Sequence, residues 1–173
     1  MASIIECAYL FKKILGQLDN FVILFQPHMN LPKYPVIVSD DLHVFEFFSE
    51  GPRGHIKKGV FYTRLGNDLY NLGFGDWVET SQDLDDSSRT NNGDRDKVLA
   101  TVASTAIAFT NRFPTARIFI EGSTAARTRL YQISIGFNLE EISEDFDIQG
   151  FASEEWETFH RGRNYKAFLI SRK

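Results

Sequence analysis

The sequence predicts an α+β fold in which an antiparallel meander is followed by helix, strand, helix and two C-terminal strands. Residues 35–76 contain short runs rich in Phe, Val and Tyr that are separated by Gly-containing turns, as expected for consecutive hairpins. Residues 94–112 repeat apolar side chains at helical spacing, and residues 118–120 form a short apolar run typical of a buried strand. We therefore expect helices packed on a mixed sheet.

Composition indicates one globular domain. The 173 residues are 43% hydrophobic and 14% aromatic, which is enough apolar material for a core. The formal net charge of −4 gives no general attraction to nucleic acid, so duplex DNA is not an expected partner. Cys7 is the only cysteine, which excludes an intrachain disulfide and favours a reducing cytoplasm.

Residues 1–28 are expected to be an N-terminal helix or a dispensable extension, and residues 29–173 a single α+β domain. Apolar residues recur roughly at helical spacing as far as Leu18. The segment is too short and too interrupted by charge to span a bilayer, so no membrane attachment is expected. Glu6 precedes the apolar region, whereas a signal peptide carries positive charge there.

The meander should contain three strands joined by tight turns. The predicted strands are His43–Glu50, Ile56–Leu65 and Leu69–Phe74, and the predicted turns are Gly51–Gly54 and Gly66–Asp68. Tyr70, Leu72 and Phe74 alternate onto one face of the third strand. The polar, acidic residues 76–95 are expected to form a loop, with a short strand possible at residues 87–90.

A long helix is predicted from Asp94 or Arg95 to Arg112, where Pro114 stops it. Asn92 is a strong candidate for the N-cap, and an acid such as Asp96 suits the positive end of the helix. The stripe expected to face the core is Val98, Val102, Ala106, Phe109 and Phe113.

The next predicted elements are a buried strand at residues 118–120 and a helix that begins near Ala125, with Ser123 or Thr124 as its N-cap. Its inward stripe is predicted to be Ala126, Leu130 and Ile133, and Gly136 is placed to end it in a left-handed conformation. Beyond this helix we expect a loop and strand at 139–148, a helical turn at 154–159 and a final strand at 165–171.

The N-termini of these two helices form the candidate ligand-binding site. A strand, a glycine and a capped helix together present free backbone N–H groups to an anion. Arg127 and Arg129 lie in the first turns, where their charge opposes the helix dipole and favours a negative partner, although surface carboxylates are the alternative partners. The predicted ligand-binding residues are Asn91, Asn92, Gly93, Lys97, Gly122, Ser123, Thr124, Arg127 and Arg129. A phosphorylated small molecule is the expected ligand.

No metal site is predicted. The four histidines are scattered without any pair at metal-ligand spacing. Asp83, Asp85 and Asp86 are close in sequence, but an acidic loop of this kind is usually solvated. The chain also lacks a phosphate-binding Walker loop, a dinucleotide-binding fingerprint and a nucleophile elbow.

Part of the second helix resembles the acyl-coenzyme A dependent N-acetyltransferases. Ala126, then Leu130-Tyr131, then Gly136-Phe137 is similar to the pattern on the penultimate helix of those enzymes, and the order of elements is similar to the later part of their fold. The resemblance implies acyl-coenzyme A as a possible cofactor and Tyr131 as a general acid in acyl transfer, with a packed tyrosine as the alternative. It also implies a pyrophosphate loop at residues 91–97, which here holds one glycine and two acids.

A second resemblance covers residues 29–173. Four segments are similar to those of a bacterial family of short proteins of unknown function: Ser49–Lys58, Asn71–Asp76, Asn91–Val102 and Gly122–Tyr131. This resemblance implies kinship and a bacterial cytoplasmic origin, and it implies no activity.

Two classes of function remain. The first is an acetyltransferase-like protein that binds a phosphorylated ligand between its two helix N-termini. The second is a non-enzymatic component of a two-gene toxin-antitoxin or defence locus that binds a partner protein or RNA. RNA is considered because residues 160–173 hold five Lys/Arg and no acid, whereas residues 140–157 hold eight acids and no base. Convergence of the predicted site residues on one pocket would favour the first class, and an exposed apolar patch the second.

Overall fold

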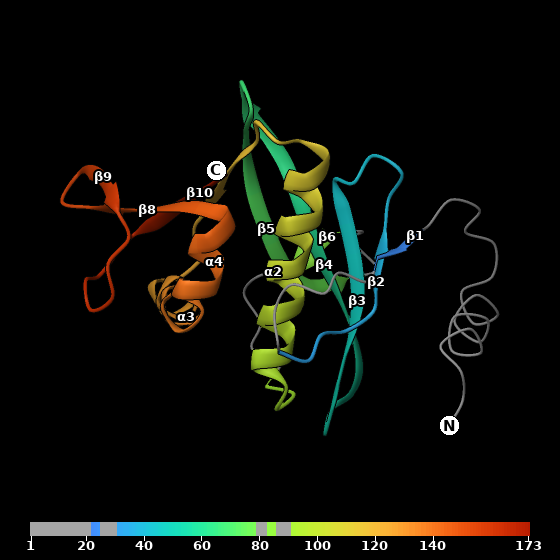
Figure 1. The fold of residues 1–173 in the computed structure, drawn as a ribbon. Coiled ribbons are helices and arrows are strands. Elements are labelled where there is room, and N and C mark those ends of the chain that lie inside the picture. The colour runs from blue at the N-terminus through green and yellow to red at the C-terminus, as the bar shows by residue number, and fades with distance from the viewer. Residues whose placement is uncertain (1–21, 25–30, 79–82, 86–90) are drawn as a thin grey trace.

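The structure, a computed structural model, describes residues 22–24, 31–78, 83–85 and 91–173. Within those residues, three helices accompany one mixed sheet of ten strands, so the predicted α+β class is confirmed (Figure 1). The helices are α2 (Arg95–Arg112), α3 (Ala125–Phe137) and α4 (Leu139–Asp145). The strands are β1 (Val22–Leu24), β2 (Val36–Val38), β3 (Val44–Gly51), β4 (Gly54–Gly66), β5 (Leu69–Val78), β6 (Asp83–Asp85), β7 (Arg117–Ile120), β8 (Phe146–Ala152), β9 (Glu155–Thr158) and β10 (Ala167–Arg172).

The sheet follows the order β1-β2-β3-β4-β5-β7-β10-β8-β9, and β6 pairs with β5 beside this path. β3, β4 and β5 form the predicted antiparallel meander. Among the described strands, only β5 and β7 are parallel, and they pair over residues 69–71 and 117–119 alone. Further along the same edge, β5 pairs with β6 from Asp76 to Val78. Within the described residues, positions 72–75 of β5 therefore have no strand partner on the edge that faces β7.

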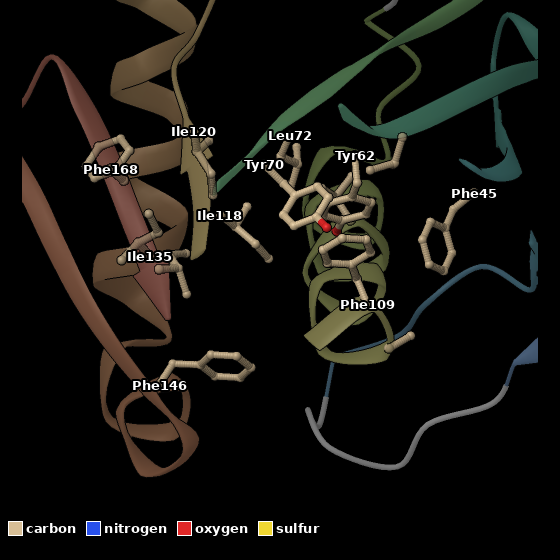
Figure 2. Close-up of a cluster of buried hydrophobic side chains, with 14 of the residues drawn as sticks. Phe45, Tyr62, Tyr70, Leu72, Phe109, Ile118, Ile120, Ile135, Phe146 and Phe168 are labelled. Carbon is tan, nitrogen blue, oxygen red and sulfur yellow. The ribbon is translucent and has the colours of Figure 1, made fainter. Parts of the chain in front are cut away.

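α2 has the boundaries and the buried face that the sequence predicts. Val98, Val102 and Phe109 are buried, and Phe109 is 0% exposed. The Phe109 ring stacks on Tyr62 of β4 with 4.0 Å between centroids, as Figure 2 shows within the buried cluster. The Tyr62 hydroxyl is also 2.8 Å from Thr105 Oγ1, and burial raises the pKa of Tyr62. Aromatic stacking and one buried hydrogen bond thus fix α2 on the meander.

The predicted inward stripe of α3 is wrong. The helix begins at Ala125 as expected, but its buried residues are Thr128, Gln132 and Ile135, whereas Ile133 is 55% exposed. Thr128 Oγ1 accepts from the backbone N–H of Gly122 at 3.1 Å. Gln132 donates to the backbone carbonyl of Arg163 at 2.6 Å and accepts from the N–H of Tyr165 at 3.2 Å. Hydropathy alone misassigns this face because its polar side chains are satisfied by distant segments.

Three boundaries toward the C-terminus also differ from the prediction. α3 continues through Gly136 to Phe137, and Gly136 is not left-handed. Residues 139–145 form helix α4 instead of a loop, in keeping with acids at its positive N-terminal end. Residues 155–158 form strand β9 instead of a helical turn, because Ser153 and Glu154 both take positive φ and make a hairpin turn with β8. Neither residue is a typical choice for that conformation, so the sequence carries no signal for this hairpin.

The opposite charges of the C-terminal region pair with one another. Arg161 lies 3.5 Å from Glu140, Arg163 lies 2.7 Å from Glu157, and Lys166 lies 2.8 Å from Glu154. Exposed pairs of this kind contribute roughly 0–1 kcal/mol each to stability. Their main consequence is electrostatic, since acidic side chains lie against the basic stretch and reduce its positive potential.

The prediction for residues 1–28 lies mostly outside the described residues. The same holds for the predicted strand at residues 87–90 and for the side chains of Asp83, Asp85 and Asp86. What is described of the N-terminal segment is β1, which pairs antiparallel with β2. In the part of the chain that the structure describes, no helix combines the length and the apolarity that crossing a bilayer requires.

We predict that a chain starting at Met29 will express and melt cooperatively. The described buried core begins at Tyr34, and what the structure describes of the removed segment is one three-residue edge strand, β1. Circular dichroism melting of the truncated and full chains tests this expectation. A truncated protein that is insoluble, beside a soluble full chain, would show that the N-terminal residues belong to the core.

Candidate functional site

The N-termini of α2 and α3 face a single open cleft of about 1340 Å³. Its walls come from segments far apart in the sequence: residues 31–34 before β2, the tip of the β3–β4 hairpin, the carboxyl end of β5, and the first turns of both helices. Phe74 and Gly75 of β5 line the cleft within the stretch that has no strand partner toward β7. The cleft thus lies at the carboxyl ends of the parallel pair, a common place for ligands in sheets with parallel strands.

Most of the predicted site residues meet in this cleft. Those that line it are Asn91, Asn92, Gly93, Lys97, Thr124, Arg127 and Tyr131. The predicted residues Gly122, Ser123 and Arg129 are not among its lining residues. The guanidinium of Arg129 donates to Asn164 at 3.1 Å, so the two arginines that the sequence treats as equivalent have different surroundings.

Gly122 has a steric role beside the site. A Cβ atom at this position would lie 2.4 Å from the backbone nitrogen of Thr128, so only glycine lets the turn approach the first turn of α3. Thr124 is the N-cap, as predicted, and its hydroxyl accepts from the N–H of Arg127 at 3.3 Å. The remaining N–H groups of this first turn have no acceptor within the helix.

The N-cap of α2 is Asp94, so the prediction of Asn92 is wrong. Asn92 is 3% exposed and ties its loop to the β3–β4 hairpin. Its carbonyl oxygen accepts from the N–H of Arg53 at 2.9 Å, and its amide donates to Ser49 Oγ at 3.0 Å and to the Gly54 carbonyl at 3.1 Å. These partners lie 38 to 43 residues away, beyond the reach of a local capping rule. The hairpin tip is thereby held at the cleft, and Arg53 with it.

A polar cluster under the N-terminus of α2 is absent from the sequence-based site. Asp94 Oδ2 accepts from the hydroxyls of Tyr34 at 2.8 Å and Ser49 at 2.7 Å. Burial acts to raise the pKa of Asp94, but these two hydrogen bonds and the charge of Lys58 outweigh it, and the pKa is lowered from its usual value. Asp94 is therefore ionised at neutral pH.

Lys58 and Asp76 form an ion pair at the base of the cleft. They lie directly opposite each other on β4 and β5, and Lys58 is only 5% exposed. Strand alternation contains a signal for this pair, because Lys58 shares its face with the buried Val60 and Tyr62. Lys58, a charged residue at an inward strand position, is therefore a signal in the sequence that the predicted site does not include.

Positive groups line both sides of the cleft. The Lys97 ammonium lies 3.8 Å from the centroid of the Tyr34 ring, near the start of α2. Neither Lys97 nor Arg53 has an ion-pair partner among the described residues, and Arg127 lines the opposite side at the start of α3. Across the described residues, no three His, Cys, Asp or Glu side chains lie close enough together to hold a metal ion. Arg53, Lys97 and Arg127 thus bring positive charge to the cleft from three separate segments.

Comparison with curated proteins and with solved structures finds no significant match. A family model does match, and it covers residues 30–173, which include every described residue that lines the cleft. The chain therefore belongs to DUF6934, a family of unknown function.

Proposed function

We propose that this protein binds an acyl-coenzyme A in the cleft and transfers its acyl group to an acceptor. The observation that supports the proposal is the convergence of two helix N-termini with Lys97, Arg53 and Arg127 on one cleft. Helix N-termini favour phosphate because their free N–H groups and the helix dipole both act on it. Arginine adds paired hydrogen bonds to phosphate oxygens. Together these groups suit a ligand that carries several phosphates.

The unpaired edge of β5 supports the same ligand. Among the strands that the structure describes, none pairs with residues 72–75 on the side of β7, and Phe74 and Gly75 line the cleft. Backbone groups at a free strand edge bind extended chains by adding them to the sheet. The arm of coenzyme A contains amide groups and matches such an edge, so it would run from phosphates held near Arg127 and the start of α3 along β5.

Tyr131 is the proposed general acid. It lines the cleft one turn after Arg127, on the same helix. When the acceptor attacks the thioester carbonyl, a bond forms from the acceptor to that carbon, and the carbon–sulfur bond breaks. The Tyr131 hydroxyl would then protonate the departing thiolate, and the proton that the acceptor loses on attack would return to the Tyr131 oxygen. The reducing cytoplasm is the proposed location, consistent with a chain that holds a single cysteine.

Isothermal titration calorimetry with coenzyme A and acetyl-coenzyme A tests the proposal. We expect micromolar binding of both that weakens as salt is raised, because the contacts are ionic. A Tyr131→Phe protein should bind acetyl-coenzyme A as the wild type does but release the free thiol more slowly when an acceptor is present. Absence of binding by either ligand at millimolar concentration would rule the proposal out.

One observation favours the second candidate, a protein that binds another protein without catalysis. Ile133 and Phe137 lie one turn apart on α3 and are 55% and 77% exposed. Exposed apolar side chains that adjoin one another often mark a protein interface. Purification from the native host, with a protein carrying Ile133→Ser and Phe137→Ser as the control, would reveal a partner that depends on this patch. In that case the patch, and not the cleft, would carry the function.

Duplex DNA is not expected to bind at physiological salt, and single-stranded RNA is expected to bind weakly at best. The net charge is −4, and Arg161, Arg163 and Lys166 each pair with a glutamate. Fluorescence anisotropy titrations with a labelled duplex and a labelled single-stranded RNA measure both affinities. Micromolar binding that persists at moderate salt would contradict this expectation, and RNA binding of that strength would favour the non-enzymatic role.

A further inference from the structure

The cleft contains both the cations that attract an anion and acids that repel one. Four carboxylates line it, and three of them lie near a basic side chain. Asp96 is 2.9 Å from Arg95, Asp76 pairs with Lys58, and Glu50 is 3.7 Å from His55. Asp94 differs, because within the described part of the chain it forms no ion pair. Its Oδ2 accepts from two hydroxyl groups, and Lys58 acts on it only through its charge.

The position of Asp94 is fixed. Its Oδ2 accepts from Tyr34 and Ser49, and both of these residues are buried. The Tyr34 hydroxyl is fixed in turn, since it accepts from the N–H of Glu50 at 3.0 Å. Asp94 also lines the cleft. A charged carboxylate thus stands at the N-cap of α2, where an incoming phosphate would otherwise meet the free N–H groups.

We infer that Asp94 is a specificity-determining residue that keeps phosphate away from the N-terminus of α2. The anionic part of the ligand is then directed to the Arg127 and Lys97 side chains and to the first turn of α3, and a hydrogen-bond donor of the ligand meets Asp94. This inference rests on the proposed function, because it concerns the same cleft. It accounts for a helix N-terminus that combines Lys97 with a carboxylate that forms no ion pair among the described residues.

The test is the affinity for inorganic pyrophosphate of the full chain and of Asp94→Asn. The asparagine oxygen still accepts from Tyr34 and Ser49, and asparagine is a favourable N-cap, so the fold should be kept. Asp96→Asn is the matched control. It removes the same charge two residues further along the chain, and Asp96 is an exposed acid that pairs with Arg95. Asp94→Ser, which also caps helices without charge, replaces Asp94→Asn if thermal melting shows that the latter is unfolded.

We expect Asp94→Asn to bind pyrophosphate about tenfold more tightly than the wild type, and Asp96→Asn to change the affinity by less than about twofold. The inference is overturned if Asp94→Asn binds no better than Asp96→Asn, if it binds more weakly than the wild type, or if no variant binds pyrophosphate. Failure of the proposed function has a different signature. In that case the wild type does not bind acyl-coenzyme A, while Asp94→Asn still gains affinity for pyrophosphate over Asp96→Asn.

Discussion

Replacing Arg127 and Lys97 together with alanine is expected to weaken acyl-coenzyme A binding by about two orders of magnitude or more. Each side chain lines the cleft at the start of a different helix. A hydrogen bond to a charged group contributes roughly 1.5–3 kcal/mol, and each 1.4 kcal/mol is about a factor of ten in affinity. The melting temperature should change by only a few degrees, because neither side chain belongs to the buried core.

The matched control for this experiment is Arg129→Ala. It removes the same charge from the same helix, but the guanidinium of Arg129 donates to Asn164 and does not line the cleft. Its affinity for acyl-coenzyme A should stay within about twofold of the wild type. If Arg129→Ala weakens binding as much as the double change of Arg127 and Lys97, the loss of affinity reflects the net charge of the protein and not contacts in the cleft. A large loss of stability without any change in affinity would show that Arg127 and Lys97 act structurally.

The second large effect is expected at the ion pair between Lys58 and Asp76. Changing Lys58 to Met leaves the Asp76 carboxylate at the base of the cleft without its ammonium partner, and changing Asp76 to Leu leaves a buried ammonium. Breaking a buried pair on one side typically costs about 3–5 kcal/mol. Each single change should therefore lower the free energy of unfolding by about that amount, as measured by urea denaturation.

The double change Lys58→Met and Asp76→Leu should recover most of the lost stability. Apolar residues of similar volume often replace a buried pair without loss, because the desolvation of both charges is avoided. The difference between the double change and the sum of the single changes is the coupling energy of the pair. If the double change loses as much stability as the two single changes added together, the two residues do not act as a pair.

The elements best predicted from sequence are those with a strong local pattern. α2 keeps its predicted ends because its apolar residues repeat every three to four positions and Pro114 stops it. The meander is predicted because its turns contain Gly, Pro, Asn and Asp, which suit tight turns. β9 is missed because its turn uses Ser153 and Glu154 at positive φ, and neither residue is a usual signal for that conformation.

The candidate site also has a part that local sequence predicts and a part that depends on tertiary packing. The two helix N-termini are recognised from the chain itself, since a cap residue and a following helix are contiguous, and Thr124 does cap α3. That these two termini open into the same cleft depends on how α2 and α3 pack on the sheet and on where β5 and β7 cease to pair. The difference between Arg127 and Arg129 likewise depends on Asn164, which is 35 residues away.

Local pattern alone was sufficient for the α+β class and for most element boundaries, because helix periodicity, strand alternation and turn chemistry act between residues that are neighbours along the chain. The hydrogen bonds of Ser49 and Tyr34 to Asp94 were decided by packing alone. They join residues 45 and 60 positions apart, and no single segment records them. Packing also determines the charge at Asp94. Burial raises its pKa, and the hydroxyls of Tyr34 and Ser49, which reach it only in the folded chain, help to lower it.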